Sequence, residues 1–204
     1  MVRFFLRQYL THFYKGLSLL LIIVSSTATS YAASYVIDST QTNVRFALDN
    51  LKTSSTTGGF YNVKGQLQYD PSSKVGTISL IIPIKSLDTG NKAFNLKLTG
   101  PEFFDIQQFP LARFESSKWY FNNSKTSPQV TQVDGNLTLH GETHPISLRA
   151  NKFECSLNPT VKKEVCGGAF TATIDRTKWN INKYILFGMT KNLTLNIQVE
   201  ATKQ

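Results

Sequence analysis

Apolar residues recur at every second position in one segment after another from Ser34 onwards. The clearest segment is 193–200, in which Leu193, Leu195, Ile197 and Val199 alternate with polar residues. The same alternation occurs in the segments 44–48, 67–69, 78–82, 137–139, 146–148 and 170–174. Successive side chains of a β-strand point to opposite faces of the sheet. This period of two therefore predicts half-buried strands rather than amphipathic helices.

Short runs of turn-forming residues separate these segments. They are Gly58-Gly59, Asp70-Pro71, Asp88-Thr89-Gly90-Asn91, Asn122-Asn123, His140-Gly141 and Gly167-Gly168. The segment 91–98 lacks the alternation and follows Asp88-Thr89, which can cap a helix, so we expect one short helix there, ended by Gly100-Pro101. The chain is thus predicted to be all-β, with roughly eight antiparallel strands and a short helix between strands.

Strands in this number form either a sandwich or a closed barrel, and the alternation does not distinguish the two. A barrel of about eight strands has an interior that side chains can fill or that can hold one small ligand. The 14 phenylalanines and 8 tyrosines of the chain could line such a cavity or form an ordinary core. No repeat, linker or low-complexity tract divides the sequence, which indicates a single domain.

The N-terminal segment has the layout of a secretory signal peptide. Three basic residues and no acidic one precede an apolar stretch at 17–24, and small residues follow it. Ser30 and Ala32 fit signal-peptidase cleavage after Ala32. A membrane anchor is the alternative, but a bilayer span needs ~20 apolar residues and this stretch is much shorter. We therefore expect a signal peptide at 1–32 and an exported, periplasmic domain at 33–204.

The chain is basic, with a formal net charge of +9 at pH 7. Nucleic-acid surfaces need basic residues clustered on one face or interleaved with aromatic residues, and here they are scattered. The charge therefore does not predict a nucleic-acid partner. It is compatible with at most transient contact with an anionic membrane surface.

Cys155 and Cys166 are the two cysteines of the chain. In an oxidising compartment an isolated pair this close in sequence predicts a disulfide with a structural role. A metal site built on two cysteines would need further ligands, and no histidine lies nearby in the sequence. The pair therefore supports export independently of the signal peptide, and we predict no metal site.

His140 and His144, with Glu142 between them, have a spacing similar to that of zinc-protease helices. Gly141 and Pro145 indicate a hairpin turn instead, and the glutamate is not in the order that the motif requires. The pair could form only an adventitious surface metal site. The sequence contains no nucleophile elbow, phosphate-binding loop or dinucleotide fingerprint. We therefore predict no catalytic residue and no cofactor.

The longest distinctive motif lies in the middle of the chain. Ser86-Leu87-Asp88-Thr89-Gly90-Asn91 is followed by Leu98-Thr99-Gly100-Pro101-Glu102-Phe103-Phe104-Asp105-Ile106 and by Phe109-Pro110. In this order the residues resemble the signature of the YceI-like family, lipocalin-like proteins of the bacterial periplasm. The stretches 35–38, 59–65, 135–141 and 174–176 are also similar, so the resemblance covers Tyr35 to Ala201. The Cys155 and Cys166 pair resembles that of a disulfide-bearing subgroup.

The resemblance implies a lipocalin-like antiparallel barrel, open at one end, whose hydrophobic tunnel carries or sequesters a long-chain amphiphile. A polyisoprenoid, an isoprenoid quinone or a fatty-acid derivative is the expected ligand, and a homodimer is compatible with the family. The residues expected to line the tunnel are Phe46, Leu48, Leu67, Leu80, Ile82 and Leu139. Those expected to cover or gate one end are Phe94, Leu98, Phe103, Phe104 and Phe109. Each buried methylene is worth ~0.8 kcal/mol, so such a tunnel needs no catalytic group to hold an extended chain.

Three positions depart from the family pattern. Gln41, Asn50 and Lys97 stand where many relatives have histidines, which leaves fewer polar contacts for a ligand head group. Two other functions stay open. One is an enzyme that acts on such a lipid or quinone through Lys97, His140 or Arg176, and it would need a titratable cluster inside the tunnel. The other is a stress-related structural protein whose barrel is filled with side chains.

Overall fold

The computed structural model describes residues 32–50, 54–124 and 126–204, so the predicted signal peptide lies outside the described residues apart from Ala32. The strands are β1 (Ala33–Ile37), β2 (Asn43–Asn50), β3 (Ser54–Phe60), β4 (Lys64–Asp70), β5 (Val75–Pro83), β6 (Leu87–Asp88), β7 (Leu111–Phe121), β8 (Val130–Leu139), β9 (Glu142–Asn158), β10 (Lys163–Asp175) and β11 (Asn192–Lys203). One α-helix, α1 (Lys92–Thr99), and three 3-10 turns, η1 (Ile84–Ser86), η2 (Arg176–Trp179) and η3 (Ile185–Phe187), complete the described elements. None of the described helices is long and apolar enough to cross a bilayer.

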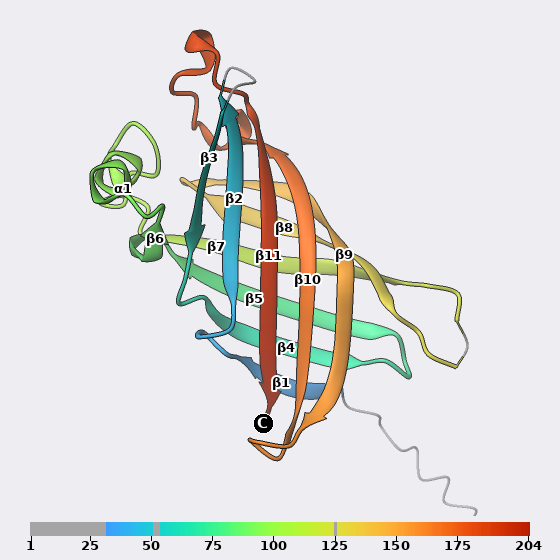
Figure 1. The fold of residues 1–204 in the computed structure, drawn as a ribbon. Coiled ribbons are helices and arrows are strands. Elements are labelled where there is room, and N and C mark those ends of the chain that lie inside the picture. Colours follow the sequence, from blue (N-terminus) through green and yellow to red (C-terminus); the bar gives the residue numbers. More distant parts are fainter. Residues whose placement is uncertain (1–31, 51–53, 125) are drawn as a thin grey trace, which may run out of the picture. The chain divides into compact units, whose positions relative to one another are not determined.

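Eight of the strands form a closed antiparallel ring, which confirms the predicted barrel (Figure 1). The ring runs β1-β4-β5-β7-β8-β9-β10-β11 and closes where β1 pairs with β11. The long strand β11 has a different neighbour along each half. It pairs with β1 at Ala201–Lys203 and with β2 at Thr194–Gln198, so β2 replaces β1 beside it farther along the barrel.

The two ends of the barrel differ. At the hairpin end, β9 and β10 are joined by the hairpin 159–162. At the helix end, β10 leads into η2, and α1 stands beside the strands (Figure 1). There β2 pairs with β3, and β3 pairs with the two-residue strand β6. No further described strand follows β6 in the sheet, and α1 and the segment 100–110 cover that side.

The interior toward the hairpin end is filled with aromatic rings. Tyr69, Trp119 and Phe153 form what we call the aromatic block, with ring centroids 5.0 to 5.8 Å apart in each pair. Tilted and edge-to-face contacts of this kind are favourable for aromatic pairs. Leu67, inside the barrel, is fully buried. This part of the barrel is therefore a packed core rather than an open tunnel.

Two glycine pairs predicted as turns lie inside strands, so those two predictions are wrong. Gly58 belongs to β3 and Gly168 to β10. A Cβ atom at Gly58 would lie 2.6 Å from the Phe46 ring, and one at Gly168 would lie 2.8 Å from the rings of Phe153 and Phe170. Glycine is needed at these positions because aromatic side chains lie flat against the strand.

The predicted helix is present, shifted by one residue. Its N-cap is Asn91, whose side chain accepts a hydrogen bond from the Phe94 N–H at 3.1 Å. Asp88 and Thr89, which were expected to cap it, bond to Gly90 and Asn95 instead. These bonds order the turn before the helix and fix where α1 starts beside β3.

Candidate functional site

A small apolar cavity lies at the helix end of the barrel, beneath α1. It has a volume of about 50 Å³, and no polar atom is exposed on its wall. It is lined by Phe46, Leu48, Thr56, Phe94, Leu98, Phe103, Phe104, Leu139, Ile174, Arg176, Ile181, Met189 and Leu193. Pockets that enclose drug-sized ligands measure roughly 300–1,000 Å³. The cavity is thus far too small for a long chain unless its cover moves.

The cover consists of α1 and the segment that folds back onto it. The Phe104 N–H donates to the Leu98 carbonyl at 3.0 Å, and the Asp105 N–H donates to the Gly100 carbonyl at 3.0 Å. This reversal turns the rings of Phe103 and Phe104 toward the barrel, where both are buried. Phe104 meets Phe60 of β3 edge to face, with centroids 5.3 Å apart. The cover is therefore held by apolar contacts, backbone bonds and side-chain bonds such as those of Asn95 and Glu102, and by no covalent link to the rest of the barrel beyond the chain itself.

The cavity is bounded by the barrel strands, by the cover and by the segment between η2 and β11. Arg176 anchors this last segment. Its guanidinium is buried and donates to three backbone carbonyls: those of Thr190 at 3.1 Å, Ile181 at 2.7 Å and Lys183 at 3.0 Å. The cation faces these carbonyls, and its aliphatic stem can line the cavity. Burial lowers the pKa of the guanidinium. Its donors are engaged in holding the loop, so the arrangement is structural.

Seven of the eleven residues predicted for the ligand site lie on the cavity wall. They are Phe46, Leu48, Phe94, Leu98, Phe103, Phe104 and Leu139. Leu67, Leu80 and Ile82 are buried in the barrel core away from the cavity. Phe109 packs on the His140 ring, with centroids 4.7 Å apart, and is not on the wall.

Sequence reasoning missed six wall residues, namely Thr56, Ile174, Arg176, Ile181, Met189 and Leu193. Ile174 and Leu193 lie in segments whose alternation was recognised, and the periodicity places them on the inner face. Ile181 and Met189 lie in an irregular segment that has no period. Ile181 is placed by its carbonyl's bond to Arg176 and Met189 by its own N–H bond to the Tyr184 carbonyl, and the sequence carries no signal for either bond.

The residues considered for an enzyme do not gather at the cavity. The Lys97 Nζ atom lies 4.5 Å from the centroid of the Tyr184 ring, and His140 Nδ1 is 3.0 Å from the Trp179 carbonyl oxygen. Of Lys97, His140 and Arg176, only Arg176 lines the cavity. Gln41 lies in an exposed turn before β2, and the side chain of Asn50 lies outside the described residues.

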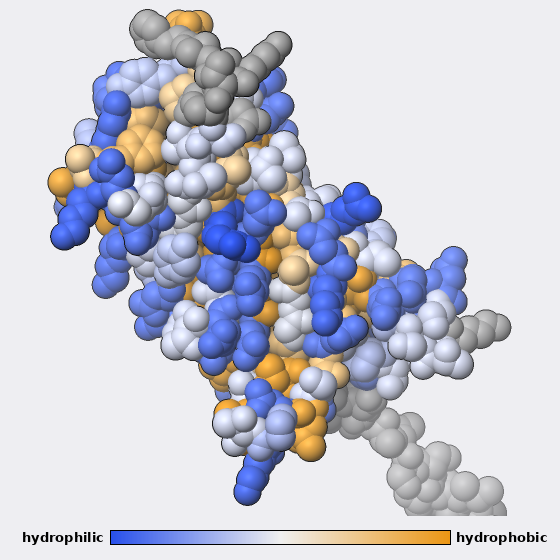
Figure 2. Space-filling view, in the orientation of Figure 1, coloured by the Kyte–Doolittle hydropathy of each residue, from blue (hydrophilic) through white to orange (hydrophobic). Residues whose placement is uncertain are grey.

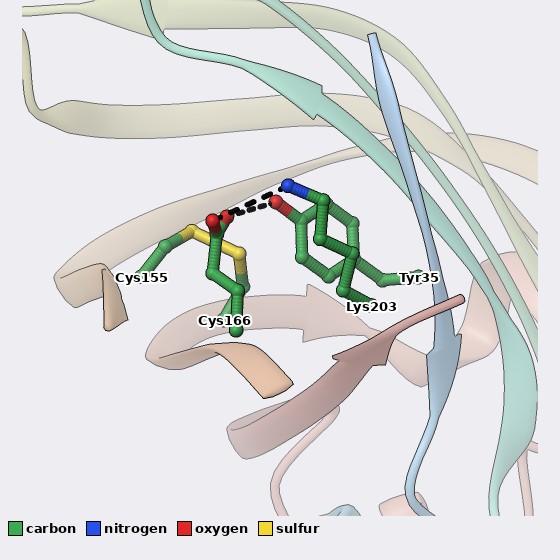
Figure 3. The surroundings of a disulfide bond; sticks show 5 residues. Tyr35, Cys155, Cys166 and Lys203 are labelled. Atoms are coloured by element: carbon green, nitrogen blue, oxygen red, sulfur yellow. Dashed lines mark hydrogen bonds and ion pairs between the residues drawn. A yellow bond between two sulfur atoms is a disulfide. The ribbon is translucent and has the colours of Figure 1, made fainter. Parts of the chain in front are cut away.

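A polar cluster lies at the hairpin end, beside the predicted disulfide, which is confirmed (Figure 3). Cys155 and Cys166 are directly opposite one another on β9 and β10. The Tyr35 hydroxyl donates to Glu164, and the Lys203 Nζ atom lies 3.3 Å from the same carboxylate. The Tyr35 bond, with help from Lys203, lowers the pKa of Glu164, while burial and the adjacent carboxylate raise the pKa of Tyr35.

The same cluster contains the one described group of three potential metal ligands, formed by Glu164 and the two cysteines. The two sulfur atoms are bonded to each other, so they do not offer thiolate ligands. Because Glu164 is bonded to Tyr35 and Lys203, the cluster joins β1, β10 and β11 at this end of the barrel.

A family model for the YceI-like domain matches residues 35–201. This chain belongs to the YceI-like family. A UPF0312 protein of Vibrio cholerae is 28% identical over 141 residues, which cover 67% of this chain and 72% of that protein. A UPF0312 protein of Yersinia pestis is 30% identical over 131 residues, covering 63% of this chain and 66% of the relative.

Solved structures share the YceI-like fold at low sequence identity. Burkholderia cenocepacia BcnA aligns over 80% of this chain and 98% of its own, with a TM-score of 0.66 and 19% identity. A Campylobacter jejuni YceI protein aligns over 76% and 90%, with a TM-score of 0.62 and 21% identity. A polyisoprenoid binding domain from Saccharophagus degradans aligns over 84% and 99%, with a TM-score of 0.61 and 12% identity.

Proposed function

We propose that this protein is an exported carrier that binds a long-chain apolar molecule inside its barrel and performs no chemistry on it. The observation that carries the proposal is the wholly apolar cavity beneath α1. A polyisoprenoid, an isoprenoid quinone or a fatty-acid derivative would suit such a wall, because each buried methylene contributes ~0.8 kcal/mol without a polar partner. The fold shared with a polyisoprenoid binding domain supports this ligand class.

Loading requires the cover to move, because a cavity of about 50 Å³ has room for only a small part of a long chain. The cover is suited to such movement. α1 has eight residues, and Leu98 is its one buried residue. Displacing α1 together with Phe103 and Phe104 would open the barrel at the helix end, and an apolar tail would replace the lost contacts.

Binding is favoured over catalysis because the cavity wall offers no free titratable group. Of the charged residues, only Arg176 lies on that wall, and its guanidinium is bonded to three carbonyls. Acid–base catalysis needs a titratable group within hydrogen-bond reach of the substrate. A lipid tail in this cavity would meet carbon atoms alone.

The first test is to look for a bound ligand on protein that was purified without detergent. Protein recovered from the exported fraction is analysed by native mass spectrometry, and the bound molecule is identified after solvent extraction. We expect a long-chain lipid that is present in the wild type and depleted in Ile174→Phe, which fills the cavity. Leu157→Phe, at an exposed position of the hairpin end, should keep the ligand. A wild-type protein that is empty, and that also fails to take up an added polyisoprenoid, would favour the filled structural barrel.

The same preparation tests export. The intact mass should correspond to a chain that starts at Ala33, with Cys155 and Cys166 oxidised. The disulfide fits an oxidising compartment such as the periplasm. A cytoplasmic protein that retains residues 1–32 and two free thiols would contradict this part of the proposal.

A further inference from the structure

The two most exposed large hydrophobic side chains among the described residues both lie at the helix end. Leu186, in η3, is 97% exposed, and Leu96, in α1, is 75% exposed. Figure 2 shows hydrophobic surface over α1 and at the loop that contains η3. Scattered exposed leucines are ordinary on protein surfaces. These two differ from scattered leucines because both lie next to the apolar cavity.

Leu96 belongs to the cover of the apolar cavity, and Leu186 belongs to the loop that forms the neighbouring wall. In the sequence, Leu96 lies between Phe94 and Leu98, and Leu186 lies between Ile181 and Met189, and these four residues line the cavity. The two segments touch through Tyr184. Its ring lies under the Lys97 Nζ atom at 4.5 Å and packs on Phe103, with centroids 6.0 Å apart.

The loop around Leu186 has a defined backbone conformation. Tyr184 and Gly188, on either side of η3, have positive φ angles of 63° and 93°. The segment that holds them is bonded at Ile181, Lys183 and Thr190 to the buried Arg176. The turn therefore keeps Leu186 exposed next to the cover, where an apolar partner could reach it.

The two segments that carry these leucines are positively charged. α1 and the segment 176–191 contain no acidic residue, and their lysines are Lys92, Lys97, Lys178, Lys183 and Lys191. Lys183 pairs with Glu102 and Lys191 pairs with Asp175. Lys92 and Lys97, in the same helix as Leu96, have no ion pair among the described residues, whereas Lys178 lies in a surface hollow that Asp134 and Asp175 also line. Single leucines among lysines are the pattern of a surface that inserts shallowly into an anionic lipid interface.

We propose that the helix end docks onto an anionic phospholipid bilayer, with Leu96 and Leu186 inserted and the unpaired lysines beside the head groups. The role of the docking rests on the proposed carrier function. A docked protein would hold the cover of its cavity against the membrane that supplies the lipid. Contact with acyl chains would replace the apolar contacts that α1 loses when it moves. The docking itself is a property of exposed residues and does not depend on a ligand in the barrel.

Vesicle flotation tests the surface directly. Wild-type protein from the exported fraction, with its N-terminus established by intact mass, is mixed with phosphatidylcholine vesicles with and without phosphatidylglycerol. We expect binding to the anionic vesicles that weakens with added salt. Leu96→Ser with Leu186→Ser should reduce the partition coefficient roughly tenfold or more. Lys92→Gln with Lys97→Gln should reduce it about fivefold per lysine at low salt.

The chain offers a matched control at its opposite end. Leu157 and Val161 are 72% and 52% exposed on the β9–β10 hairpin, where Glu154 and Glu164 offset the charge of Lys162 and Lys163. Leu157→Ser with Val161→Ser should leave vesicle binding unchanged. Binding that is lost in this control and kept in the leucine pair of the helix end would overturn the proposal, as would a wild type that ignores anionic vesicles at low salt.

Ligand uptake separates this proposal from the proposed function. The helix-end leucine variant should take up a polyisoprenol presented in a water-soluble complex at the wild-type rate, and extract it from vesicles more slowly. Failure to bind polyisoprenol in either form would count against the carrier function, while the flotation result would still decide the docking surface.

Discussion

At the scale of single residues, Arg176 has the largest expected effect on the helix end. Replacing it with methionine removes three charge-assisted hydrogen bonds and leaves three carbonyls without that donor. We expect Arg176→Met to lower the free energy of unfolding by about 3 kcal/mol, measured by urea denaturation. Arg176→Lys should lose less, because one ammonium can restore part of the bonding. A loss below about 1 kcal/mol for methionine would mean that water satisfies these carbonyls.

Glu164 gives the stability of the protein a defined pH dependence. Its pKa is held below the ordinary value of 4.5 by the hydrogen bond from Tyr35 and by Lys203. A carboxylate with a depressed folded-state pKa stabilises the fold above its unfolded pKa, and this contribution is lost as the pH falls through the folded pKa. We therefore expect Glu164→Gln to be less stable than the wild type at pH 7, and the difference to shrink as the pH falls below 4.5.

Urea denaturation across that pH range measures the difference. Glu154→Gln is a suitable control, because Glu154 lies on the same hairpin in an exposed pair with Lys152. That variant should show little difference at either pH, since exposed pairs contribute little. A Glu164→Gln difference that is independent of pH would show that the carboxylate charge is not the stabilising feature.

At the scale of elements, α1 is expected to act as a separately opening unit. Leu98 is its one buried residue, whereas Leu96 is 75% exposed on the same helix. Leu98→Ala should lower the opening free energy of the cover by about 2 kcal/mol, which corresponds to roughly thirtyfold faster exchange of a bound probe. Leu96→Ala should exchange a water-soluble probe at the wild-type rate. Hydrogen exchange of the α1 amides measures the opening directly, and equal protection in both variants would contradict a movable cover.

An element could be predicted from the sequence when its packing depends on residues close to it in the chain. β11 was predictable because Leu195, Ile197 and Val199 are buried on one face of a regular strand. Gly168 was mistaken for a turn because its reason is non-local: the Phe153 ring, on the neighbouring strand, occupies the space of a side chain. The same glycine signal arises from a turn and from an aromatic ring packed across strands.

The candidate site was predictable only where its residues follow the local alternation of a strand or the family motif. Periodicity and the family motif identify inward-facing residues such as Phe46, but periodicity does not tell how far along the barrel a residue lies. Leu67 faces inward and is fully buried away from the cavity. Ile181 lacks any period, because its position is set by the Arg176 hydrogen bond across the loop. The small cavity volume is a property of packing density, which no sequence pattern encodes.

At the scale of the whole molecule, the barrel is asymmetric along its length. The cavity and its cover are at the helix end, while the aromatic block and the Tyr35–Glu164–Lys203 cluster fill and tie the hairpin end. On the proposed carrier function, a ligand would enter from the helix end with its tail foremost and would displace core side chains such as Leu67 until it meets the aromatic block. The distance from the cover to the block would then set the tail length that can be buried.

A series of fatty acids of increasing chain length tests this distance. Affinity should rise about fourfold per methylene, which corresponds to ~0.8 kcal/mol, and then level off when the tail meets the aromatic block. Phe153→Leu removes a ring from the block and should move the plateau to longer chains. Phe109→Leu removes a ring packed on His140 away from the cavity and should leave the plateau in place. Calorimetric titration gives the affinities, and a plateau that moves equally in both variants, or that is absent, would mean that the block does not limit the ligand.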